Sequence, residues 1–300
     1  MQKSDRKFNR GSLYITCAAL CWSLGGVLIK LVPWNAMAIA GLRSLIAFAI
    51  TVLFSRSFKI TLTKTNILGA IGLSGTAILF ILANKYTTAA NAIVLQYTAP
   101  VYILILSMIF LKKPVKKLDL AGILIILSGI VLFFFDDLSG GHLVGNILSL
   151  ASGVFFAIMF FINSTEGATP MEATRLGHLI SAAVGLPFIF TSTGVTFEPI
   201  PWLAIFAMGA VQLGLAYVLF SKGSPLVSPI AASLISCIEP VLNPVWVMLV
   251  IGETPGFWSI IGIIVVISGV VLYNIVSTRE GQKNSESETR LIKSEKNVEI

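Results

Sequence analysis

One carboxylate lies in the middle of an apolar segment that is long enough to cross a lipid bilayer. Glu239 is followed directly by Pro240 within the apolar run 229–251, and about 20 apolar residues span the hydrocarbon core as a helix. A charged side chain at that depth costs about 3 kcal/mol on insertion scales. Because proline has no N–H, Pro240 leaves the carbonyl of Ser236 without its helical partner, and Pro244 removes another such bond. We expect the polar side of this helix to face a protein interior or a water-filled cavity.

Helical spacing places four residues of this run on one face. They are Ser236, Glu239, Asn243 and Trp246. A functional interpretation makes Glu239 either the site that recognises a substrate amine or a protonatable coupling group. A structural interpretation has Glu239 satisfying the backbone groups that the prolines leave open. Trp246 has the alternative role of an anchor at the membrane interface.

The composition indicates a membrane protein with several spans. Of the 300 residues, 56% are hydrophobic and 12% are charged, whereas a soluble domain has about 25% charged residues. The net charge of +7 is scattered over loop ends and tails, which does not predict a nucleic-acid partner. The sequence has no glycine-rich phosphate loop, no His/Cys metal cluster and no Ser-His-Asp set in a plausible context. We therefore predict no enzyme, no cofactor and no metal site.

Apolar runs bounded by proline, glycine and charge predict an all-α membrane protein of ten transmembrane helices. The predicted spans are 12–32, 36–54, 66–84, 89–111, 118–135, 145–163, 173–190, 202–220, 229–251 and 256–276. The predicted organisation is an N-terminal segment 1–11, a first five-helix unit 12–135, a second unit 145–276 and a disordered tail 277–300.

The distribution of Lys and Arg predicts the orientation of the chain. With the N-terminus inside, most of these residues fall into the inner segments 1–11, 55–64, 112–117 and 277–300. One inner loop is an exception, because it contains Glu166 and Glu172 and no basic residue. An even number of spans then places both termini in the cytoplasm, with the protein in the inner or plasma membrane.

The two halves of the sequence resemble each other. Pro100 corresponds to Pro240, and at a slightly smaller offset the first and second spans correspond to the sixth and seventh. Corresponding pairs are Ala92/Ala232, Gly122/Gly262, Gly129/Gly269, Trp22/Phe156 and Arg43/His178. Five spans per copy is an odd number, so the two copies must have opposite orientations in the membrane. Inverted repeats of this kind place a substrate site near the midplane, often at broken helices.

With ten spans, two five-span repeats, the Glu239-Pro240-Val241 segment and the paired glycine helices, the chain resembles the drug/metabolite transporter superfamily, and within it the EamA-type members. The resemblance covers about residues 12 to 276. It implies a membrane transporter of small metabolites such as amino acids, sugars or related compounds. The first-half counterpart of Glu239 is Ala99, so the acidic residue is present in one copy only.

Further candidate pathway residues come from the repeat. Gln96 corresponds to Ser236, and Arg43 and His178 could receive an anionic group or form structural contacts. Trp22 and Phe156 could form an aromatic floor or be packing residues. Tyr217 lies in the eighth span, where Gly209 and Gly214 permit close helix approach.

Together these patterns predict a secondary active transporter, exporter or importer, that works by alternating access. The expected partners are a small-molecule substrate, the bilayer and a proton or sodium ion, with the protein acting as a monomer or homodimer. Two alternatives are a translocase for lipids or lipid-linked sugars and a scaffold or sensor that transports nothing. The polar residues inside the spans argue against a scaffold.

Overall fold

The computed structural model describes most of the predicted membrane domain. The described residues are 3–87, 89–111, 116–133, 135, 143–191, 195–252, 256–258, 260–262, 264–269, 271–273 and 275–276. The predicted disordered tail 277–300 lies outside the described residues.

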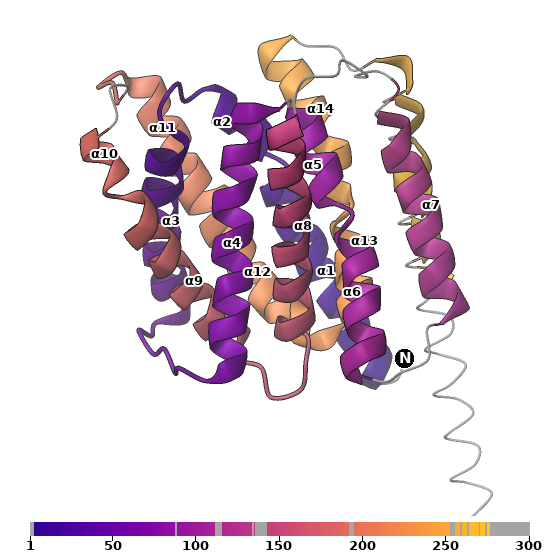
Figure 1. Ribbon diagram of the computed structural model, residues 1–300. Coiled ribbons are helices and arrows are strands. Elements are labelled where there is room, and N and C mark those ends of the chain that lie inside the picture. The colour runs from indigo at the N-terminus through magenta and orange to yellow at the C-terminus, as the bar shows by residue number, and fades with distance from the viewer. Residues whose placement is uncertain are drawn as a thin grey trace, which may run out of the picture.

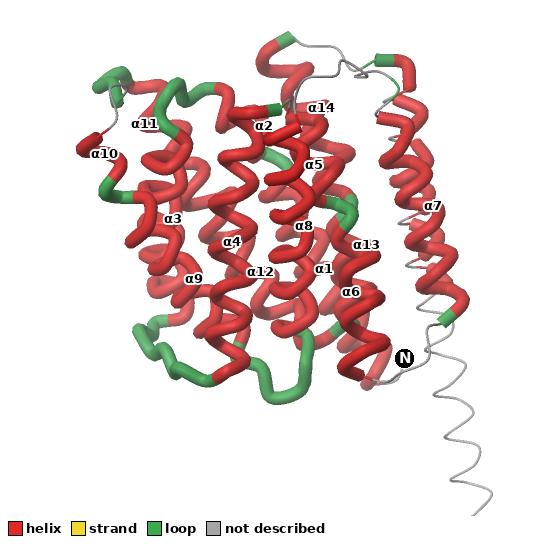
Figure 2. The backbone as a smooth tube through the Cα atoms, in the orientation of Figure 1, coloured by secondary structure: helices red, strands yellow, loops and turns green. Residues whose placement is uncertain are grey.

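All secondary structure in the described ranges is helical (Figure 2). The first half contains α1 Lys3–Trp22, α2 Gly25–Lys30, α3 Ala36–Ser55, α4 Lys64–Tyr86, α5 Ala89–Gln96, α6 Ala99–Leu106, the π-helical turn η1 Ser107–Leu111 and α7 Lys117–Phe133. The second half contains α8 Leu143–Asn163, α9 Pro170–Gly185, α10 Phe188–Thr191, α11 Pro199–Ala207, the π-helix η2 Met208–Leu215, α12 Ala216–Gly223, the 3-10 turn η3 Ser224–Leu226, α13 Pro229–Ser236 and α14 Ile238–Ile251.

The predicted all-helical membrane architecture is confirmed. Eight helical stretches in the described residues are long and apolar enough to cross a membrane, and their ends lie within about three residues of the predicted spans, apart from the start of the first and the end of the eighth. The fifth predicted span is α7, with 17 residues. The last predicted span contains the apolar helix Ile260–Tyr273, which runs over residues that are not described. This helix packs against α7 through glycines: a Cβ on Gly129 would lie 3.1 Å from the carbonyl oxygen of Gly262.

Four of the described spans are interrupted inside the membrane domain (Figure 1). The first is interrupted between α1 and α2, the fourth between α5 and α6, the seventh between α9 and α10, and the ninth at Cys237 between α13 and α14. Pro100 and Pro240 both fall in the first turn of the helix that follows the break. The N–H groups of a first turn have no intrahelical partner, so proline costs little there. Pro244 lies inside α14, which continues through it.

The two halves interlock through backbone contacts between α3 and α9. A Cβ on Gly41 would clash with the backbone nitrogen of Leu186 and would lie 2.5 Å from the carbonyl carbon of Gly185. A Cβ on Gly185 would in turn lie 2.5 Å from the nitrogen of Gly41. Small residues at a helix crossing let two backbones approach this closely. Only glycine fits at these two positions, so α3 of the first half is held directly against α9 of the second.

The acidic inner loop that the charge pattern left unexplained is paired with the basic segment beside it. Glu172, in the first turn of α9, accepts hydrogen bonds from the backbone N–H of Thr61 at 2.7 Å and from its hydroxyl. The ammonium of Lys59 is 3.9 Å from the same carboxylate. Arg175 donates to the carbonyl oxygens of Ser57 and Lys59, both at 2.6 Å. The acid therefore fastens the connection between α3 and α4 to the start of α9.

A hydrogen bond in the α3–α4 connection has a counterpart at the opposite end of the bundle. Asn66 Nδ2 donates to the carbonyl of Thr61 at 2.9 Å, and Trp202 Nε1 donates to the carbonyl of Thr196 at 3.0 Å. In the repeat, Thr61 corresponds to Thr196 and Asn66 to Trp202, at offsets that differ by a single position. The α3–α4 connection lies at the bottom of Figure 1 and the start of α11 at the top. The same hydrogen bond at opposite ends of the bundle is what an inverted repeat predicts.

Replacing Glu172 with Ala should lower the melting temperature of the purified protein by several degrees. The change leaves the partly buried N–H and hydroxyl of Thr61 without their acceptor, and a lost hydrogen bond to a charged group is worth about 1.5–3 kcal/mol. Glu166→Ala is the matched control, because Glu166 is an exposed acid in the connection between α8 and α9, just before Glu172. Equal melting temperatures for the two variants would show that the contact does not fasten the loop.

Candidate functional site

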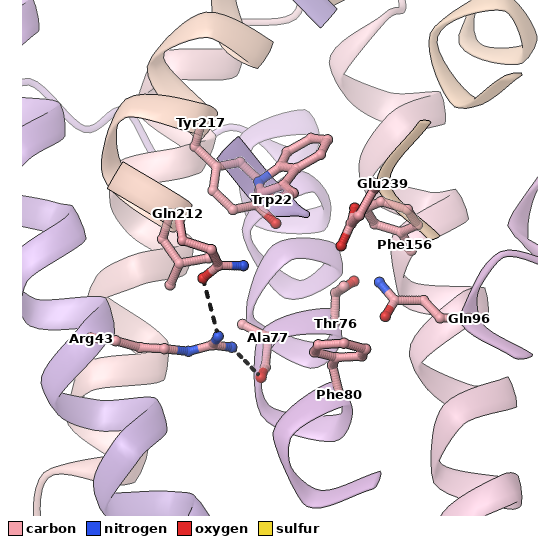
Figure 3. A pocket seen from close by; sticks show the side chains of 11 residues that line it. Trp22, Arg43, Thr76, Ala77, Phe80, Gln96, Phe156, Gln212, Tyr217 and Glu239 are labelled. Atoms are coloured by element: carbon pink, nitrogen blue, oxygen red, sulfur yellow. Dashed lines mark hydrogen bonds between the residues drawn. The ribbon is translucent and has the colours of Figure 1, made fainter. Parts of the chain in front are cut away.

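A cavity lies between the two halves, and both contribute to its walls (Figure 3). Its lining residues are Trp22, Arg43, Thr76, Ala77, Phe80, Gln96, Phe156, Gln212, Leu213, Tyr217 and Glu239. The empty volume is about 350 Å³ including space that opens outward, and the centre of a water molecule can occupy only about 30 Å³ of it. One buried water needs about 10–15 Å³ by that measure. In this conformation the cavity has room for a few water molecules, and a larger guest requires its walls to move.

An aromatic cluster forms one wall of the cavity. Trp22, the last residue of α1, packs edge-on against Phe156 of α8 with ring centroids 6.0 Å apart, and against Tyr217 of α12 at 5.1 Å. Phe160 and Phe220 lie behind them, 6.3 and 5.6 Å from the Trp22 ring. Trp22 and Phe156 correspond in the repeat, and the structure brings both to the same cavity. Both expectations for these two residues therefore apply, because they line the cavity and are also part of the hydrophobic core.

Arg43 is a buried cation whose hydrogen bonds in the described structure go to neutral groups. The residue is 1% exposed, and one guanidinium nitrogen donates to the carbonyl of Ala77 at 2.9 Å. The second makes a weak contact of 3.5 Å with Gln212 Oε1, and Nε has no partner. No acidic side chain of the described residues forms an ion pair with it. A buried charge without an opposite partner is costly, so the guanidinium is available to an anionic group that enters the cavity.

Gln212 reaches Arg43 because the eighth span changes its helical winding there. The π-helix η2 runs from Met208 to Leu215, and π segments inside α-helices often mark functional sites. On either side of Gln212, a Cβ on Gly209 would lie 2.9 Å from the carbonyl oxygen of Arg43, and one on Gly214 would lie 2.7 Å from the side chain of Ile50. The two glycines let this span approach α3, which places the amide beside the guanidinium.

Glu239 occupies the opposite side of the same cavity, beside Gln96 (Figure 3). It is 6% exposed, and its Oε2 accepts a hydrogen bond of 2.6 Å from the hydroxyl of Tyr97. In the described part of the chain no Lys, Arg or His forms an ion pair with it. Neither Arg43 nor His178 forms a hydrogen bond or ion pair with Glu239; the contact comes from a tyrosine instead. The carboxylate is in the first turn of α14, directly after the break at Cys237.

Of three further candidates, Gln96, Ser236 and Trp246, one lines the cavity and two do not. Gln96 lines the cavity, and its side-chain amide oxygen Oε1 has no hydrogen-bond partner. The hydroxyl of Ser236 donates to the carbonyl of Ala232 on its own helix, at 2.8 Å. Trp246 Nε1 donates to the hydroxyl of Ser23 at 2.8 Å, which ties α14 to the break between α1 and α2. Ser236 and Trp246 serve the broken helices and are not among the residues that line the cavity.

Asn243 and His178 are buried beside the cavity without lining it. A Cβ on Gly26 would clash with Asn243 Oδ1, so α2 and α14 meet at these two residues. His178 is fully buried behind Tyr217, with ring centroids 5.2 Å apart and both ring nitrogens without a partner. The repeat position shared by Arg43 and His178 therefore contributes to the lining in the first half only.

The candidate residues predicted from the sequence did not include five residues that line the cavity, nor the contact between Tyr97 and Glu239. The five are Thr76, Ala77, Phe80, Gln212 and Leu213. Thr76 corresponds to Gln212 and Ala77 to Leu213, at the same offset that relates Asn66 to Trp202, so the repeat contained a signal for them. Tyr97 could be recognised only as a neighbour of Gln96, because nothing in the sequence shows that its hydroxyl reaches Glu239. Among the described residues no group of three His, Cys, Asp or Glu could hold a metal ion.

Comparisons with known proteins identify the family. A family model described as "EamA-like transporter family" matches residues 9–135 and 143–275. The uncharacterized transporter YyaM of Bacillus subtilis is 26% identical, over 74% of this chain and 78% of its own. The uncharacterized inner membrane transporter YicL of Salmonella typhimurium is 23% identical, over 91% of this chain and 98% of its own.

The fold also occurs among solved structures. One crystal structure of another protein superposes with a TM-score of 0.76 at 20% identity. The match covers 90% of this chain and 98% of the solved one. At this level of identity the likeness supports the fold alone. The expected family and the expectation of a transporter rather than an enzyme are confirmed by the family match.

Proposed function

Because this chain belongs to the EamA-like transporter family, we propose that it is a secondary transporter of a small zwitterionic metabolite, such as an amino acid or a related compound. One observation carries the choice of a zwitterion: Arg43 and Glu239 line the same cavity, and neither has an ion partner in the described part of the chain. A molecule that has both an anionic and a cationic group would satisfy both side chains.

The chemistry of each side chain suits one end of such a substrate. A guanidinium binds carboxylate groups well because its N–H donors match the two oxygens, and the unpaired Nε of Arg43 is one such donor. A carboxylate accepts hydrogen bonds from an ammonium group, and Glu239 is positioned across the cavity to do so (Figure 3). The aromatic cluster around Trp22 offers an apolar wall for the rest of the molecule.

Alternating access supplies the movement that the small cavity requires. The breaks after α5 and α13 come from corresponding places in the two halves, and the equivalent hydrogen bonds of Asn66 and Trp202 lie at opposite ends of the bundle. Rocking of one repeat against the other would open one end at a time. We further propose that a proton or sodium gradient drives the cycle, and that the division at residues 135 and 145 separates the two repeats.

The orientation proposed from the basic segments places both termini in the cytoplasm. A reporter fused after residue 300 should give a cytoplasmic signal, and one inserted beside Glu198, in the connection before α11, should give an external signal. The opposite pattern would reverse the assignment of the inner and outer ends of the cavity.

Uptake into proteoliposomes tests the proposed function. Labelled amino acids and sugars are offered under defined pH and sodium gradients, each accepted substrate being compared with its decarboxylated and deaminated analogues. Each analogue keeps only one of the two charges, so we expect uptake of the zwitterion and at least about tenfold slower uptake of both analogues. Equal uptake of zwitterion and amine would exclude Arg43 as a carboxylate site, and uptake of sugars alone would refute the proposed substrate class.

A further inference from the structure

The hydroxyl of Tyr97 lies between two acceptors on the broken helix of the second half. Its oxygen is 2.6 Å from Glu239 Oε2 and 2.9 Å from the carbonyl oxygen of Ser236. A tyrosine hydroxyl has one hydrogen to donate, and an ionised carboxylate and a carbonyl can only accept. While Glu239 is ionised, Tyr97 can therefore serve one of these two acceptors and not both.

The carbonyl of Ser236 needs this donor because of the sequence that follows it. Ser236 is the last residue of α13, and the residue four positions later is Pro240, which has no N–H. The ring of Tyr97 is held in place: the residue is 1% exposed and packs edge-on against Phe156, with centroids 5.6 Å apart. The hydrogen of the hydroxyl can rotate between the two acceptors while the ring stays where it is.

One proton on Glu239 changes which acceptor is served. In the ionised state, Tyr97 donates to the carboxylate because a charge-assisted hydrogen bond is the stronger one, and the carbonyl of Ser236 loses its donor. In the protonated state, the carboxyl has its own O–H and can donate to the oxygen of Tyr97, whose hydrogen then turns to Ser236. The proton is taken up from hydronium in the solvent, which becomes water, and it stays on Glu239, so Tyr97 keeps its own proton throughout.

From this geometry we propose that Tyr97 is a positioning residue that transmits the protonation state of Glu239 to the break between α13 and α14. Tyr97 itself lies in the corresponding break between α5 and α6, and it matches Cys237 in the alignment that pairs Pro100 with Pro240. One hydroxyl therefore connects the two broken helices of the inverted repeat. This inference rests on the proposed transport function, and it adds a route by which a proton alters the helices that line the cavity.

Other titratable groups near Glu239 do not offer the same connection. Tyr217 approaches from α12, Cys237 lies in the same turn and Arg43 lies across the cavity, and none of them forms a hydrogen bond with the carboxylate in the described structure. The residues that face it from α1, α4 and α8 are uncharged: Trp22, Thr76 and Phe156. Tyr97 is the side chain that touches both Glu239 and the backbone at the break.

The variant Tyr97→Phe tests this inference, since it keeps the ring and removes only the hydroxyl. Uptake into proteoliposomes is measured across a range of pH for the wild type, Tyr97→Phe, Glu239→Gln and the double variant. We expect Tyr97→Phe to lower uptake about tenfold or more and to flatten its pH dependence, with no further loss when it is added to Glu239→Gln. Tyr102→Phe, on the half-buried side of α6, is the matched control and should retain the wild-type profile. A wild-type pH profile in Tyr97→Phe, or losses that multiply in the double variant, would overturn the inference.

An infrared difference spectrum between low and high pH gives a readout that needs no transport. The carboxyl band of Glu239 is identified by its absence in Glu239→Gln. The inference predicts that this band shifts in Tyr97→Phe, because the protonated carboxyl loses its acceptor, and that it is unchanged in Tyr102→Phe. An unshifted band refutes the role of Tyr97 even if the protein transports well. A shifted band in a protein that transports none of the candidates supports the contact while the proposed function fails.

Discussion

Replacing Arg43 with Gln should reduce uptake of a zwitterionic substrate by about 100-fold or more. Truncating one partner of a buried hydrogen-bonded charge pair costs about 2–5 kcal/mol, and Arg43 is the cation that lines the cavity and lacks an acidic partner among the described residues. Arg43→Lys should recover only part of the activity, because an ammonium cannot form the paired hydrogen bonds of a guanidinium.

The variant Arg175→Gln is a matched control for this prediction. Arg175 is also a buried arginine that donates to backbone carbonyls, but it fastens the loop between α3 and α4 and does not line the cavity. We expect it to lower the melting temperature and to leave the apparent affinity for substrate within about threefold of the wild type. If Arg43→Gln lost activity only in proportion to its melting temperature, as Arg175→Gln should, the guanidinium would be structural.

Glu239→Gln is the second change with a large expected effect. The amide keeps the shape of the carboxyl and can still accept the hydrogen bond from Tyr97, so we expect normal insertion and a melting temperature near that of the wild type. The negative charge is lost, and with it the partner of a substrate ammonium and the group that could bind a proton. Uptake should fall by about 100-fold or more, and any remaining uptake should no longer depend on pH.

Two further variants separate the charge of Glu239 from its place in the fold. Glu239→Ala removes one of the two acceptors of the Tyr97 hydroxyl and leaves a cavity at the break, so it should lower the melting temperature as well as uptake. Glu198→Gln neutralises an exposed acid before α11 and should change neither quantity. Wild-type uptake by Glu239→Gln at every pH would refute both the coupling and the charge-recognition roles.

The sequence predicted the helices well because apolar length and charge determine where a chain can cross a bilayer. Pro100 and Pro240 also predicted that the fourth and ninth spans depart from regular helices, since a missing N–H is a local property of the chain. The break between α1 and α2 has no proline, although Gly25 and Gly26 follow it directly, and Trp246 donates a hydrogen bond to Ser23 at the break. That contact joins residues far apart in the sequence, so no local pattern could reveal it.

The sequence predicted which residues line the candidate site better than it predicted which of them contact one another. Six of the ten proposed pathway side chains line the cavity: Trp22, Arg43, Gln96, Phe156, Tyr217 and Glu239. The repeat could show that Arg43 and His178 correspond, but it could not show that one faces the cavity while the other lies behind Tyr217. The link from Tyr97 to Glu239 depends on how the two breaks meet in space, which is set by long-range packing and not by spacing.

Protection of a cysteine in the cavity tests most directly whether substrate binds between Arg43 and Glu239. Thr76 lines the cavity on α4, whereas Leu68 is an exposed residue of the same helix. In a transport-competent background without Cys17, Cys21 and Cys237, Thr76→Cys and Leu68→Cys are labelled with a membrane-permeant thiol reagent. A saturating transported substrate should slow labelling at position 76 about tenfold, in line with its occupancy, and leave position 68 unchanged. Equal labelling of position 76 with and without a substrate that the same vesicles transport would contradict this location of the site.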